Sequence, residues 1–185
     1  MDKKIKILGI SGSLRKNSYN TAAMRIAVSL VPENAEIEVF EKLGEIPPFN
    51  QDFEQTPPEI VTELKQSIRA ADAILFALPE YNYSIPGVLK NAIDWVSRPY
   101  GDNAWEGKPV AMMSASISML GGARAQYHLR QVFVFLDMHP LNRPEVMIPS
   151  AADKFDEQGN LTDTHTKEKI AELLQALVKK VETYH

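Results

Sequence analysis

Residues 73–78 read Ala-Ile-Leu-Phe-Ala-Leu, a run of six apolar residues that contains no charged or polar residue. A short run that is apolar throughout is typical of a strand covered on both faces, as in the middle of a parallel sheet. Segments with helical apolar spacing lie on both sides of it, at residues 59–71 and from Pro86, a favoured first-turn proline, to about residue 96. A buried strand between two helices is the repeating unit of an α/β fold.

The rest of the chain repeats this alternation of strand and helix. We expect further strands at residues 5–10, 35–40, 110–115 and near 146–148, and further helices at residues 21–30, 123–138 and about 166–184. The strand at 35–40 alternates apolar and charged residues, which favours an outer position with one wetter face. Residues 41–58 contain four prolines and no clear period, so we expect a loop there. Five strands and five helices predict a parallel sheet with right-handed crossovers, in either the Rossmann order or the flavodoxin-like order 2-1-3-4-5.

The composition is that of an ordinary globular protein, with 185 residues of which 44% are apolar and 24% are charged. This length predicts a single domain over residues 1–185, since roughly 100–200 residues make one domain. A net charge of −4 without a basic run disfavours nucleic-acid binding, and the absence of cysteine excludes disulfides and thiolate metal sites. The apolar run within residues 1–10 is too short for a signal peptide, and no run is long enough for a membrane span. We therefore expect a soluble, cytoplasmic protein.

The loop after the first strand, residues 9–20, has the residues of an anion site. Gly12 permits a tight turn, and the loop leads into a helix start whose free amides attract anions. Its hydroxyls, amide and guanidinium suit a phosphate monoester, and they come from Ser11, Ser13, Ser18, Asn20 and Arg15. The spacing is neither that of a nucleotide P-loop nor that of the dinucleotide fingerprint. The alternative is a polar turn with a solvated arginine.

Two further loops follow predicted strands, and ligands of open parallel sheets bind at the carboxyl ends of strands. Residues 79–87 contain two prolines and two tyrosines, which make a stiff, flat-walled loop suited to a planar heteroaromatic ring. The alternative is that Tyr81 and Tyr83 cap the core. Residues 114–122 end in Gly121-Gly122, which permits close approach to a ligand but is also common at the start of a helix.

Three segments, GSLRKNSYN at 12–20, PEYNYSIPGVLKNAIDW at 79–95 and GGARAQYHLRQ at 121–131, together resemble the NADPH-dependent FMN reductases, in particular the chromate and quinone reductase branch. The resemblance runs in order from about Ile5 to Met147. It implies a flavodoxin-like fold, FMN as cofactor and NADPH or NADH as co-substrate. The implied activity is electron transfer through FMN to quinones, azo dyes, free flavin or metal oxyanions such as chromate.

The resemblance also assigns cofactor contacts to the three loops. The residues that match the phosphate site are Ser13, Arg15, Ser18 and Asn20, and Tyr19 in the same loop is a further cofactor contact. The residues that match the segment beside the isoalloxazine ring are Pro79, Glu80, Tyr81 and Asn82. The residues that match the third flavin loop are Ser116, Gly121 and Gly122. Relatives tend to have Ser-Pro-Gly where this chain has Ser116-Ile117-Ser118, so the third loop is expected to follow a different path. Because the cofactor carries the redox chemistry, we assign no catalytic residue and no metal ligand.

Other classes of function fit the residues less well. A hydrolase would need a Gly-x-Ser-x-Gly elbow, which residues 9–13 miss by one place. The four histidines form no metal pair at helical spacing, and they are His128, His139, His165 and His185. A flavodoxin-type electron carrier, or a flavin-binding sensor without turnover of its own, stays open as the alternative. Carriers usually have a strongly charged face, and steady-state oxidation of NADPH with a quinone distinguishes the classes.

The predicted helix at 123–138 favours self-association. Residues 132–136 are five consecutive apolar residues, which surround a helix that needs only one apolar stripe. Its outer face therefore needs a cover, either a second subunit or the tail of the same chain. The resemblance implies a dimer or tetramer and places Arg124, Tyr127 and Glu145 at subunit contacts.

Overall fold

The computed structural model describes residues 4–184, so Met1 to Lys3 and His185 lie outside the described residues. Within this part of the chain, six strands form one sheet in which every pairing is parallel. The strands are β1 (Ile5–Ser11), β2 (Ala35–Phe40), β3 (Ala73–Ala77), β4 (Pro109–Ala115), β5 (His139–Pro140) and β6 (Val146–Ile148). Their order is β2-β1-β3-β4-β5, with β6 also paired to β4. This is the flavodoxin-like order, so the Rossmann alternative is wrong.

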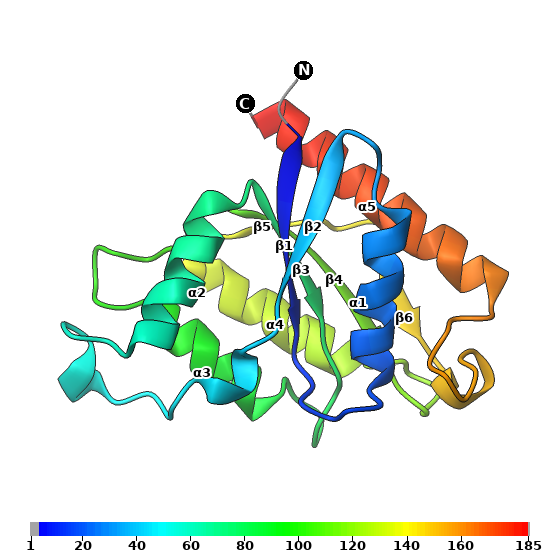
Figure 1. Ribbon diagram of the computed structural model, residues 1–185, viewed down its shortest axis with the longest axis horizontal. Helices are drawn as coiled ribbons and strands as arrows, with labels where there is room; N and C mark the ends of the chain where they lie inside the picture. Colours follow the sequence, from blue (N-terminus) through cyan, green and yellow to red (C-terminus); the bar gives the residue numbers. More distant parts are fainter. Residues whose placement is uncertain (1–3, 185) are drawn as a thin grey trace.

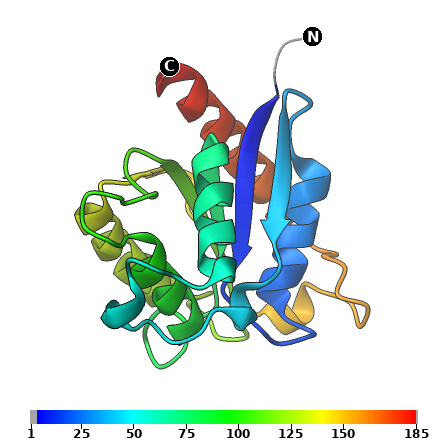
Figure 2. The same cartoon turned by 60° about the vertical axis from the view of Figure 1, so that its left-hand side comes forward.

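Helices cover both faces of the sheet and make a three-layer sandwich (Figures 1 and 2). They are α1 (Tyr19–Leu30), α2 (Glu59–Ala70), α3 (Gly87–Val96), α4 (Ala123–Leu136) and α5 (Thr164–Tyr184). Helices α1 and α5 pack on one face, and α2, α3 and α4 pack on the other. Every residue of β3 is buried, and its side chains alternate between the two cores, with Ile74 and Phe76 on one side and Leu75 on the other. The apolar run therefore forms the central strand that its sequence predicts.

The predicted bounds differ from the structure mainly at the far edge of the sheet. The strand predicted near 146–148 is β6, but it pairs with the carboxyl half of β4, while the unpredicted β5 pairs with the amino half. Two residues show no periodicity, so β5 leaves no pattern to detect. Helix α4 ends at Leu136 instead of residue 138, because Asp137 is left-handed with a φ of 52°. The proline-rich loop at 41–58 contains two short 3₁₀ turns, Leu43–Glu45 and Gln51–Phe53.

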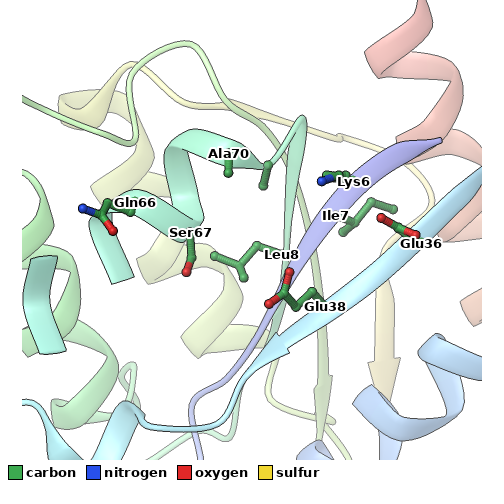
Figure 3. Close-up of a pocket in the computed structure, with 9 residues that line it drawn as sticks. Lys6, Ile7, Leu8, Glu36, Glu38, Gln66, Ser67 and Ala70 are labelled. Atoms are coloured by element: carbon green, nitrogen blue, oxygen red, sulfur yellow. The ribbon is translucent and has the colours of Figure 1, made fainter. Parts of the chain in front are cut away.

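Strand β2 is an edge strand, as its alternating pattern predicts. A hollow of about 270 Å³ lies between β2 and α2 (Figure 3). Its lining includes the side chains of Glu36 and Glu38 from β2 and Lys6 from β1. The hollow lies along the strands and not at their carboxyl ends, so we take it as the wetter face of the edge strand. Among the described residues, no helix has the length and apolar character needed to cross a bilayer.

Candidate functional site

The loops after β1, β3 and β4 meet at one end of the sheet, the lower edge in Figure 1. The amide of Gly12 donates to Ala77 O at 2.8 Å, which continues the β1–β3 pairing into the first loop. A Cβ at Gly12 would lie 3.1 Å from Pro86 and 3.5 Å from Pro79, so glycine lets the first two loops pack closely. The structure thus brings the three predicted loops together.

The first loop gives α1 a positive amino end. Ser18 caps the helix, with its hydroxyl accepting from the amides of Asn20 at 3.2 Å and Thr21 at 3.3 Å. The first turn of α1 contains no acidic residue. Arg15 is exposed, its guanidinium lies 5.4 Å from the centre of the Tyr19 ring, and no carboxylate among residues 4–184 pairs with it. The helix dipole and the guanidinium therefore both favour negative charge at this end.

The amino end of α4 is different, because a carboxylate already occupies it. Gly122 precedes the helix and offers no side-chain cap. The Glu80 carboxylate accepts from the amides of Arg124 at 3.1 Å and Ala125 at 3.4 Å, and it pairs with the Arg124 guanidinium at 2.6 Å. This carboxylate offsets the positive end of the helix. The start of α4 therefore disfavours a second anion, whereas the first turn of α1 has no acidic residue.

Several predicted contact residues hold the loops in place. The Asn20 side chain is buried, and its amide exchanges two hydrogen bonds with the Ala115 backbone, at 2.9 and 2.8 Å. Gly121 and Gly122 both have positive φ. A Cβ at Gly121 would lie 3.0 Å from the backbone at 147–148, and one at Gly122 would lie 2.7 Å from Ser114. These glycines are required by packing within the chain, and their contact with a cofactor stays a prediction.

The second loop ends in a tight turn that presents aromatic side chains. Tyr81 and Ser84 exchange backbone hydrogen bonds of 3.0 Å in both directions, and Asn82 and Tyr83 between them have φ of 49° and 67°. The side chains of Tyr81 and Tyr83 are 49% and 66% exposed, so the alternative that they cap the core is wrong. The turn thus leaves two aromatic rings at the carboxyl edge of the sheet.

The third loop adds apolar side chains to the same edge. Ser116 closes the loop on itself, since its hydroxyl accepts from the Ser118 amide at 3.1 Å. Ile117, Met119 and Leu120 between β4 and α4 are exposed. We call Tyr81, Tyr83, Ile117, Met119 and Leu120 the apolar rim. Exposed apolar groups at a ligand-binding edge are suited to flat, poorly hydrated molecules.

The Glu80–Arg124 pair is the main feature that the sequence interpretation missed. Glu80 was expected beside a flavin ring and Arg124 at a subunit contact, and the structure joins them within one chain. The other two expected subunit contacts also meet within the chain, with Tyr127 Oη donating to Glu145 at 2.9 Å. This hydrogen bond raises the pKa of Tyr127. Residues 44 positions apart show no local pattern, so no sequence signal could have identified the Glu80–Arg124 pair.

The donor set fits a flavin mononucleotide. The positive end of α1 with Arg15 suits the phosphate, and the apolar rim suits the ring. Within residues 4–184, no three His, Asp or Glu side chains are grouped so that they could hold a metal ion. The site is therefore suited to a cofactor that is held by hydrogen bonds and apolar contact.

Comparisons with known proteins show the family to which the chain belongs. A family model described as NADPH-dependent FMN reductase matches residues 5–153. The chain is 56% identical over 178 residues to the NAD(P)H-dependent FMN reductase PA1204 of Pseudomonas aeruginosa, covering 96% of this chain and 95% of the relative. It is 43% identical over 181 residues to a quinone reductase of Pseudomonas putida, covering 97% and 94%. The structure of FerB, a flavoenzyme NAD(P)H:(acceptor) oxidoreductase from Paracoccus denitrificans, superposes with a TM-score of 0.89 at 35% identity, covering 97% and 98%.

Proposed function

This chain belongs to the NADPH-dependent FMN reductase family, and from that premise we propose how its residues serve the reaction. It is an FMN-dependent oxidoreductase that takes electrons from NADPH or NADH. Quinones and free flavin are the acceptors that we propose first, and azo dyes and metal oxyanions such as chromate extend the same chemistry. The contrast between the two helix starts supports this placement of the cofactor, because α1 is capped by the neutral Ser18 hydroxyl whereas α4 is capped by the Glu80 carboxylate.

The phosphate would be held by the first loop. Arg15 is free to supply a charge-assisted hydrogen bond, and the amides and hydroxyls of residues 13–20 supply neutral donors. Ser18 and Asn20 act mainly by shaping this loop, since their side chains already have partners within the chain.

The ring would lie between the second and third loops. Pro79, Tyr81 and Asn82 would border it on one side, and Ser116 with the glycine pair on the other. When bound, FMN supplies the two-electron redox chemistry between nicotinamide and acceptor. The protein holds the ring, leaves one face open and excludes water through the apolar rim. No side chain of the chain is needed as an acid or base, so we assign no catalytic residue.

Two measurements test this function. The purified protein is expected to show flavin absorbance at close to one FMN per chain, and it is expected to oxidise NADPH steadily when a quinone is added. A protein that binds FMN but does not turn over unaided would be a carrier or a sensor instead. A protein that binds no flavin would refute the assignment of the site.

We also propose that the chain assembles into a dimer or tetramer through α4. Val134 and Phe135 are 82% and 75% exposed, so the tail of the same chain does not cover them and that alternative is wrong. A second copy would bury these side chains and bring Arg124, Tyr127 and Glu145 close to a symmetry axis. Light scattering at micromolar concentration is expected to give a multiple of the mass of one chain. A mass near 20.7 kDa with flavin bound would refute the proposal.

The single-domain organisation over residues 1–185 and the cytoplasmic location are parts of the same proposal. The described strands share one sheet, which supports the first. The use of nicotinamide co-substrates without cysteine chemistry supports the second.

A further inference from the structure

One side chain joins the second loop to α4. The two oxygens of the Glu80 carboxylate have separate partners: Oε1 accepts from the Arg124 guanidinium, with Nε at 2.6 Å, and Oε2 accepts from the two backbone amides at the start of the helix. The Glu80 side chain is 9% exposed and that of Arg124 is 34% exposed. Because the Glu80 carboxylate is nearly buried, removal of Arg124 would leave a buried charge without its ion-pair partner.

The same arginine also supports the tip of the second loop. Its guanidinium carbon lies 3.5 Å from the centre of the Tyr83 ring, which is a cation–π contact. Asn82 and Tyr83 both have left-handed backbone conformations; asparagine adopts this conformation readily, so the strain in the turn lies at Tyr83, the residue that Arg124 contacts. His128, one helical turn further along α4, adds a hydrogen bond of 3.1 Å to Ser84.

These contacts differ from those that hold the base of the loop. The base is fixed by the sheet, since Leu78 donates to Met113 O at 3.0 Å, and by the packing of Pro79 and Pro86 against Gly12. The tip extends beyond the sheet and is held by side chains of α4. Loss of the arginine would therefore move the tip and leave the fold in place.

We propose that Arg124 is a positioning residue of the flavin site, acting through Glu80 and Tyr83 to fix the second loop relative to the start of α4. The inference rests on the proposed function, because the second and third loops are the proposed walls of the ring site. It assigns Arg124 a role within one subunit, which is separate from its proposed place at a subunit contact.

The test compares three arginine variants with the parent protein. Arg124→Met keeps the length of the side chain but removes both the charge and the planar group, so we expect FMN to bind about 10-fold more weakly. The visible absorbance or circular dichroism of the bound flavin is expected to change as well, because the surroundings of the ring change. Arg124→Lys is expected to recover part of the affinity, since an ammonium group pairs with Glu80 but cannot stack as a plane on Tyr83.

Arg130→Met is the matched control. Arg130 lies on the same helix, but its guanidinium donates to Leu141 O at 2.7 Å and does not touch the second loop. We expect its FMN affinity and flavin spectrum to equal those of the parent. Light scattering on every variant separates the two roles of Arg124, because a pure subunit contact would change the mass and leave the flavin spectrum of the dissociated chain unchanged.

Each outcome decides the proposal. The proposal is overturned if Arg124→Met binds FMN with the affinity and spectrum of the parent. It is also overturned if Arg130→Met loses as much FMN affinity as Arg124→Met. If Arg124→Met does not fold, Arg124→Lys decides the proposal, because it keeps a charge beside Glu80, removes the planar contact with Tyr83 and is expected to give the same spectral change in smaller measure. A parent protein without FMN would refute the proposed function and this inference together, whereas a flavin-bound parent with an unaffected Arg124→Met refutes the inference alone.

Discussion

Replacing Arg15 with alanine tests the phosphate site most directly. Arg15 is exposed and has no carboxylate partner among the described residues, so its removal breaks no ion pair within the chain. A charge-assisted hydrogen bond to phosphate contributes about 1.5–3 kcal/mol. Arg15→Ala should therefore weaken FMN binding roughly 10- to 150-fold. The stability of the flavin-free protein should change by less than about 0.5 kcal/mol, as for other exposed positions.

The assay is a fluorescence titration of flavin-free protein with FMN, repeated at two salt concentrations. Because the lost interaction is electrostatic, the difference between parent and variant should shrink as salt rises. Lys179→Ala is a control of equal charge, since Lys179 is an exposed residue near the end of α5, far from the carboxyl edge of the sheet. An Arg15→Ala affinity equal to that of the parent would refute the phosphate assignment. An equal loss of FMN affinity in Lys179→Ala would show that the affinity depends on the net charge of the protein and not on the position of Arg15.

Three further predictions concern other parts of the molecule. Because the chain lacks a dinucleotide fingerprint, NADPH should bind weakly and only when FMN is present, and tight binding to flavin-free protein in calorimetry would contradict this. Phe135→Asp places a charge in the exposed apolar face of α4, so the mass from light scattering should fall towards that of one chain; an unchanged mass argues against α4 as the interface. Lys65 and Arg69 hold the pKa of Asp102 below its ordinary value of 3.8, so the stabilisation is present at neutral pH and is lost as the pH falls below about 3.8. Asp102→Asn should therefore lower the melting temperature by a few degrees at pH 7, and this difference should shrink progressively as the pH falls below 3.8; a difference independent of pH would count against the ion pairs.

The architecture could be predicted because its signals are local. The run at 73–78 is apolar throughout, which predicts a strand buried on both faces, and the run at 35–40 alternates, which predicts a strand with one exposed face. Together the two patterns identify the central strand and the edge strand. The loops could be found because they follow strands, and ligands of parallel sheets bind at that edge. Strand β5 could not be found, since His139–Pro140 is too short to show a period.

The site was harder to predict because its side chains are shared between elements far apart in sequence. Asn20 is a residue type that often contacts ligands, but its side-chain amide forms hydrogen bonds with the backbone of Ala115, which lies 95 residues away. The Glu80 carboxylate accepts a hydrogen bond from the first turn of α4, a helix that begins 43 residues later. A motif indicates which residues lie at a site, whereas the partner of each polar group follows only from the tertiary arrangement.

The exposed edge of β2 has a consequence for how copies of this chain can meet. An edge strand presents unpaired backbone groups on which another strand can add, and repeated addition leads to fibres. Glu36 and Glu38 stand on one face of β2, two residues apart. A second β2 laid alongside would bring like charges opposite each other, which is unfavourable. The carboxylates that line the hollow beside α2 are therefore expected to disfavour the pairing of one β2 edge with another.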